Sequence, residues 1–160
     1  MESELLGALV GAGATIAVAV AGAAGVVING RLEHRREKAA IKGALFAEVR
    51  ALCCIIEGRR YREDLAASAL HVQKTKEAIA FTVPVPEHYC SIYRTHLSSV
   101  GTLSPEDAAA IVRFYQLVDS VVRDVTPGGV IAGGTDDPQP FIQAKEFLDE
   151  AIDLADRLKS

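Results

Sequence analysis

The sequence predicts an all-α membrane protein, with a transmembrane helix at the N-terminus followed by a cytosolic bundle of four or five helices. Three observations predict this fold. Residues 5–28 carry no charged side chain, and basic residues follow this stretch but do not precede it. The rest of the chain shows apolar residues at helical spacing between short segments rich in Pro and Gly. We therefore divide the chain into an extracytoplasmic tail (1–4), a span (5–28), a basic juxtamembrane helix (29–43) and a cytosolic domain (44–160).

The apolar stretch from Leu5 to Ile28 is long enough to cross a bilayer. Its 24 residues would extend roughly 36 Å as a helix, against a hydrocarbon core of about 30 Å. Because Lys and Arg near a span stay on the cytoplasmic side, we expect the N-terminus outside the inner (plasma) membrane and the body in the cytoplasm. Two alternatives stay open: a cleaved signal peptide, despite the acidic start, and a buried helix of a soluble protein.

The span has a face of small residues. Thirteen of its 24 residues are Gly or Ala. Projected at about 100° per residue, one narrow face collects six positions: Gly7, Gly11, Ala14, Val18, Gly22 and Gly25. Such a face lets another helix approach closely, so we expect the protein to form a homo-oligomer through it. The alternative is a generic Ala/Gly-rich anchor in which the alignment arises by chance.

Charge is distributed unevenly after the span. Residues 31–43 contain five basic and two acidic residues. This segment suits the headgroups of the lipid bilayer, and the expected contacts are Arg31, Arg35, Arg36 and Lys38. From residue 44 onward there are 12 basic and 17 acidic residues, a net charge of −5. A body of that sign is a poor binder of nucleic acid, because phosphate affinity comes from clustered cations.

The first part of the body is predicted to be a helix from Arg31 to about Glu57. Its apolar stripe consists of Ile41, Leu45, Val49, Leu52 and Ile56. A second stripe lies on nearly the opposite face and consists of Tyr61, Leu65, Ala69, Val72 and Ile79. Gly58 stands between the two stripes, so the helix either breaks there or continues and changes partners.

Proline and glycine place the remaining elements. Pro84 and Pro86 predict an extended connector, followed by a short helix over 87–100 that Gly101 ends. Ser104 followed by a proline is a strong helix start, and this helix is expected to reach about Val125 as the core of the body. Residues 126–140 are expected to be a mobile loop, and residues 141–158 a final amphipathic helix.

The chain shows no convincing catalytic, cofactor or metal site, and we expect no cofactor. His88, Cys90 and His96 are metal-ligand types, but their spacing is unusual for zinc and a fourth ligand is missing. Cys90 as a nucleophile would lack a third, orienting group. The glycine pairs at 128–129 and 133–134 match no nucleotide-binding pattern. The basic cluster at 59–62 is either a solvated surface or a contact with a partner or lipid. The three cysteines are expected to be reduced and mostly buried.

The first third of the chain resembles single-span membrane proteins encoded in bacterial and prophage genomes. The likeness lies in the apolar start, the basic segment 31–38 and the segment 44–49, and it implies no activity or site residue. We expect a non-enzymatic, single-pass membrane protein that self-associates through its span and presents a cytosolic helical domain to a protein partner. The alternative is a membrane-active oligomer, either holin-like or a pore-forming effector of host defence.

Overall fold

The computed structural model describes residues 32–158, and their regular structure is helical apart from one isolated β-bridge. The all-α prediction is confirmed for these residues. The chain divides into two compact units, residues 1–40 and 41–160. In the first unit, residues 32–40 are helical, with Arg35 and Arg36 exposed and Lys38 half-buried.

The predicted span lies outside the described residues, so its helix and its orientation stay predictions. The same holds for the positions on its small-residue face and for the first residue of the basic segment: Gly7, Gly11, Ala14, Val18, Gly22, Gly25 and Arg31. Within residues 32–158, none of the helices has both the length and the apolar character needed to cross a bilayer.

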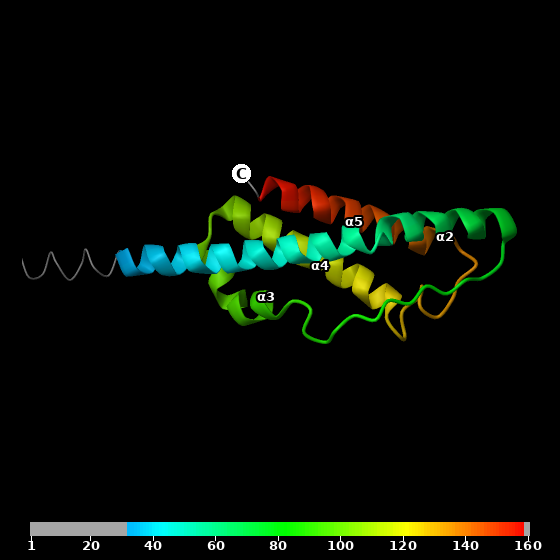
Figure 1. The fold of residues 1–160 in the computed structure, drawn as a ribbon, viewed down its shortest axis with the longest axis horizontal. Helices are drawn as coiled ribbons and strands as arrows, with labels where there is room; N and C mark the ends of the chain where they lie inside the picture. Colours follow the sequence, from blue (N-terminus) through cyan, green and yellow to red (C-terminus); the bar gives the residue numbers. More distant parts are fainter. Residues whose placement is uncertain (1–31, 159–160) are drawn as a thin grey trace, which may run out of the picture. The chain divides into compact units, whose positions relative to one another are not determined.

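The second unit begins with helical residues 41–58 and continues through four α-helices and a 3-10 helix (Figure 1). The named elements are α2 (Tyr61–Thr75), α3 (Ser91–His96), η1 (Leu97–Thr102), α4 (Pro105–Val125) and α5 (Gln139–Arg157). α4 packs against α5, and α5 also packs against α2. The bounds predicted for α4 are confirmed, and those predicted for α5 are correct to within two residues.

α4 and α5 form the centre of the core. The Ser104 hydroxyl accepts a hydrogen bond from the Asp107 amide at 3.1 Å, which caps α4 as its sequence predicts. Seven α4 side chains are buried: Ile111, Phe114, Tyr115, Leu117, Val118, Val121 and Val125. Seven α5 side chains are buried as well: Phe141, Ala144, Leu148, Ala151, Ile152, Leu154 and Ala155. Two long amphipathic helices therefore supply about half of the buried hydrophobic residues of the described chain.

The stripe on the helix at 41–58 is also covered by the chain itself. Ile41, Leu45, Val49 and Ile56 are buried, and Leu52 is half-buried. Such a stripe can either anchor the body or extend a contact between copies of the chain. Its burial within one chain favours the anchoring role.

The helix breaks after Gly58, but the glycine is not the residue with the unusual backbone. Residues 59–60 form a turn, and Arg60 has φ 58° and ψ 33°, in the left-handed region, just before α2 begins at Tyr61. A second left-handed residue, Lys76, follows the end of α2. Ile79 therefore lies beyond the helix, where it forms a β-bridge with Thr135. Its assignment to the second helical stripe was wrong, because the helix ends four residues earlier.

The short helix predicted over 87–100 differs from the structure. Residues 87–90 form a turn, α3 begins at Ser91, and the chain then tightens into η1. Gly101 lies inside η1 and does not end the helical segment. The start of α3 coincides with a contact that the local sequence does not reveal, since the amides of Ile92 and Tyr93 donate to a distant carboxylate, that of Glu48.

The segment between α4 and α5 is held by backbone hydrogen bonds. The amides of Ile131 and Ala132 both donate to the Asp124 carbonyl, at 3.1 and 2.9 Å, and the Ile131 side chain is fully buried. Gly129 lies so close to the preceding turn that a Cβ there would be 2.0 Å from the Arg123 carbonyl oxygen. The glycines of this segment therefore serve its turn geometry. Its mobility stays a prediction.

Candidate binding pocket

The second unit contains an apolar cavity of about 200 Å³. It lies among the helix at 41–58, α2, α4, α5 and the connector, by which we mean residues 81–86. Thirteen of its sixteen lining residues are aliphatic residues or proline, and the other three are aromatic: Tyr61, Phe81 and Tyr89. A concave site lined almost entirely by apolar side chains is a usual form for a small-ligand pocket.

One face of α4 forms a long side of the cavity. Val118, Val121, Val122 and Val125 recur at intervals of three and four residues, so they share one face of the helix. Three of them are buried, and Val122 is half-buried. β-Branched side chains have few rotamers, and this side of the cavity is therefore stiff.

The connector forms the opposite side. It belongs to the extended stretch of chain that leads from the end of α2 back toward α3 (Figure 1). The Phe81 amide donates to the Ile131 carbonyl at 3.1 Å, and the Val83 amide donates to the Val125 carbonyl at 3.0 Å. Pro84 and Pro86 have no amide hydrogen, so this part of the connector lines the cavity with fewer backbone donors that would need a partner.

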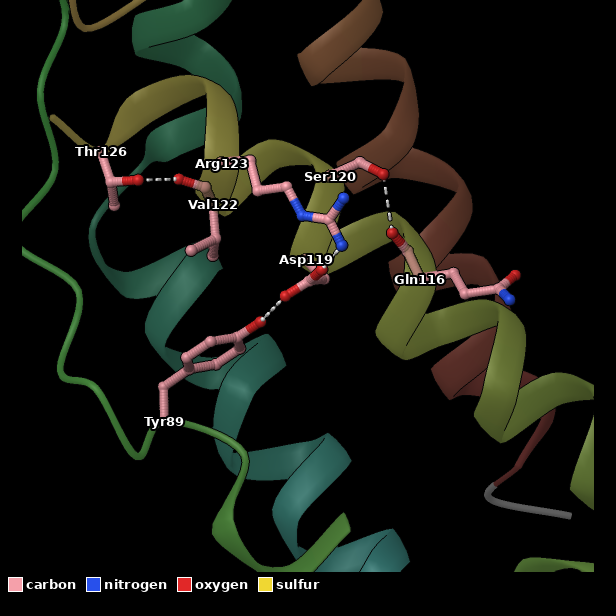
Figure 2. A network of polar contacts seen from close by, with 7 residues as sticks. All are labelled: Tyr89, Gln116, Asp119, Ser120, Val122, Arg123 and Thr126. Atoms are coloured by element: carbon pink, nitrogen blue, oxygen red, sulfur yellow. Dashed lines mark hydrogen bonds and ion pairs between the residues drawn. The ribbon is translucent and has the colours of Figure 1, made fainter. Parts of the chain in front are cut away.

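Tyr89 forms the end of the cavity nearest α3, and its hydroxyl is already engaged. The hydroxyl donates to Asp119 Oδ1 at 3.0 Å, while the other Asp119 oxygen pairs with Arg123 (Figure 2). Burial of the ring, together with the neighbouring carboxylate, raises the pKa of Tyr89. The hydroxyl therefore remains a protonated donor at neutral pH.

Two further hydroxyls near this network bond to their own helix. Ser120 donates to the Gln116 carbonyl at 2.9 Å, and Thr126 donates to the Val122 carbonyl at 2.8 Å (Figure 2). Such bonds to the preceding turn occupy the hydroxyl hydrogen. Neither hydroxyl is among the groups that line the apolar cavity.

A buried carboxylate holds α3 to the rest of the unit. Glu48 is 8% exposed, and its two oxygens accept hydrogen bonds from the Ile92 amide at 2.8 Å, the Tyr93 amide at 2.9 Å and the Tyr115 hydroxyl at 2.6 Å. The rings of Tyr93 and Tyr115 stack with centroids 3.9 Å apart. Burial and the Glu48 carboxylate raise the pKa of Tyr115. Because both carboxylate oxygens have donors, this cluster is an anchor and not a poised catalytic base.

The sequence interpretation missed Glu48, although a signal for it exists. Glu48 lies three residues after Leu45 and four before Leu52, so it falls on the apolar face of its helix. A single carboxylate on such a face needs donors from another element. The sequence does not say that these donors come from residues more than 40 positions away.

The residues considered for metal or nucleophile chemistry are spread out in the structure. Cys90 is buried, His88 is exposed and His96 is half-buried. Over residues 32–158, no group of three or more His, Cys, Asp or Glu side chains is arranged to hold a metal ion. Of the other two cysteines, Cys53 is buried and Cys54 is exposed.

The basic cluster at 59–62 divides into paired and unpaired cations. Arg62 pairs with Asp149 at 3.2 Å, and Asp149 also pairs with Lys145. Burial raises the pKa of Asp149, but the two cations outweigh it and the pKa is lowered overall. Arg59 and Arg60 are exposed and form no ion pair with the part of the chain that the structure describes.

Comparisons of the chain with protein-family models, with curated proteins and with solved structures found no match. The interpretation of the cavity therefore depends on its geometry and chemistry.

Proposed function

We propose that the protein is a non-enzymatic, single-pass membrane protein that self-associates through its glycine-faced span and presents its helical domain in the cytoplasm as a binding module. The proposal combines the uncharged stretch at 5–28, with its asymmetric flanks, and the architecture of residues 41–158. The domain offers a concave apolar surface in which the hydroxyl of Tyr89 is already bonded. Such a surface is better suited to binding a ligand than to catalysing a reaction.

The observation that carries the proposal is the burial of the stripe at 41–56. Leu45 and Val49 are 0% and 2% exposed within one chain. The helix that follows the basic segment therefore does not need a second copy to cover its apolar side. Self-association is then best supported by the small-residue face of the span, where close helix approach is favoured.

The orientation can be tested with an impermeant thiol reagent on intact cells that express the full chain with Ser3→Cys. The introduced thiol should be labelled before lysis. The native Cys54 is exposed and supplies an internal control, because it should be labelled only after lysis. Labelling of both sites only after lysis would contradict the orientation.

The membrane-active oligomer remains the second candidate, favoured by the glycine content of the span. Release of an entrapped dye from liposomes that contain the purified protein distinguishes the two functions. An interaction protein should leave the dye inside, whereas a pore-forming effector should release it. In either case, cross-linked oligomers should be lost in Gly11→Ile and Gly22→Ile and kept in Gly13→Ile, which lies off the small-residue face.

A further inference from the structure

The apolar cavity has the properties of a site for one hydrocarbon chain. We propose that it binds the alkyl chain of a fatty acid, with the carboxylate left in water near Arg59 and Arg60. The inference concerns residues 41–158 alone and does not depend on the predicted span. Three observations support it: the size of the cavity, the small number of polar groups among its lining side chains and the cations at the adjacent turn.

The size of the cavity fits a single chain. An apolar cavity of about 150 Å³ is known to hold one benzene ring, so the cavity of about 200 Å³ has room for on the order of eight carbons. That is a large part of one medium-length acyl chain. The two long chains of a bilayer lipid would need several times this space.

The chemistry of the lining selects hydrocarbon over peptide. The hydroxyls of Tyr61 and Tyr89 are the two polar groups among the lining side chains, and that of Tyr89 is bonded to Asp119. Pro84 and Pro86 have no amide hydrogen to donate. A peptide inserted here would bring amides that the lining could not satisfy, at a cost of about 1–3 kcal/mol each. Hydrocarbon brings no such groups, and an empty apolar cavity of this kind does not hold water well.

The segment of residues 57–60, which ends in the turn at 59–60, supplies charge for the carboxylate. It joins two residues that line the cavity, Ile56 and Tyr61, and the lining residue Ile55 is 53% exposed at the same place. Arg59 and Arg60 contribute two positive charges to this segment and Glu57 contributes one negative charge, so its net charge is +1. An anionic headgroup outside the cavity would therefore be favoured over a neutral one.

The test uses the full chain in phosphatidylcholine nanodiscs and a ten-carbon fatty acid with a diazirine at its methyl end. After irradiation, cross-linked peptides should come from residues 52–65, 81–89 and 118–125. A phosphatidylcholine that carries the same diazirine in one chain should not label these peptides. Labelling of the three segments by the phospholipid, or their lack of labelling by the fatty acid, would overturn the proposal.

Matched variants locate the site. Val122→Phe places a ring in the cavity, and Leu52→Phe does so from a different helix, in case the first variant folds poorly. Val112→Phe is the control, because Val112 is equally half-buried on α4 but does not line the cavity. Circular dichroism confirms the fold of each variant. Labelling should fall by at least about tenfold in a folded cavity variant, equivalent to about 1.4 kcal/mol, and persist in the control. Equal labelling of cavity and control variants would overturn the proposal.

A separate comparison tests whether the headgroup is a carboxylate. The fatty-acid probe should label more strongly than the alcohol of the same length, because only the carboxylate interacts with the cations. Arg59→Gln should reduce this difference. Equal labelling by acid and alcohol in the unchanged protein would overturn the assignment to a fatty acid.

Discussion

The two sides of α4 are built in different ways. Toward α5, α4 meets another long helix, and the small α5 residues Ala144 and Ala151 are fully buried. Toward the connector, α4 meets an extended segment that is fixed by single backbone bonds, such as that from Val83 to Val125, and the cavity remains between them. Two long helices meet with regular, interdigitating faces, whereas a proline-containing segment has fewer and less regular side chains with which to fill space.

The largest effect should follow the loss of a large side chain on the packed side of α4, by which we mean the side that faces α5. Phe141 of α5 is fully buried, so Phe141→Ala should lower the free energy of unfolding by about 4 kcal/mol. Val122→Ala removes atoms that already border a cavity and should cost about 1 kcal/mol or less. Thermal unfolding of the full chain, followed by circular dichroism, measures both. Similar losses in the two variants would contradict the comparison.

The second largest effect should follow the loss of the Glu48 carboxylate, which anchors α3. Glu48→Ala leaves two amides and the Tyr115 hydroxyl without their acceptor, and it should cost about 3 kcal/mol. Glu48→Gln keeps one oxygen acceptor and should lose less. Hydrogen exchange of the Ile92 and Tyr93 amides reports the contact directly, since both should exchange faster in the Ala variant. Unchanged exchange would mean that the carboxylate does not hold α3.

Two substitutions that each enlarge a side chain test how much free space lies on the two sides of α4. Ala144→Val adds volume where none is free and should cost about 1–3 kcal/mol. Val122→Ile adds volume next to the cavity and should change the stability by about 0.5 kcal/mol or less. The two midpoints of thermal unfolding give the comparison. Equal destabilisation would show that both sides of α4 are filled.

The packed side was predictable from the sequence and the cavity side was not. The cap at Ser104 and the periodic apolar residues of α4 and α5 are local signals, because helical spacing alone places them on one face. Three features of the other side depend on partners distant in the chain: the donors to Glu48, the pairing of Ile79 with Thr135 and the position of the connector along α4. The left-handed Arg60 was also unexpected, since the neighbouring Gly58 is the residue that usually adopts such a backbone.

The smallest effect concerns pH. Lys42 donates to Asp107 at 2.6 Å and lowers the pKa of this carboxyl in the folded protein. A lowered folded pKa adds stability that is present above the unfolded value of about 4 and lost as the pH falls below it. Because the pair is partly exposed, Asp107→Asn should cost at most about 1 kcal/mol at neutral pH and less at pH 3. Unfolding midpoints at the two pH values test this, and equal costs would contradict it.

Xenon is a direct probe of the cavity beside the connector, because it enters apolar cavities without needing any specific ligand. Methyl NMR spectra of the full chain in nanodiscs should show xenon-dependent shifts at Leu52, Val118 and Val122, which line the cavity. The methyl groups of Leu45 and Ile111, which are fully buried and do not line the cavity, should not move. Shifts confined to the first group would confirm an open cavity beside the connector. Shifts at Leu45 and Ile111 equal to those of the lining residues, or no shift at all, would contradict it.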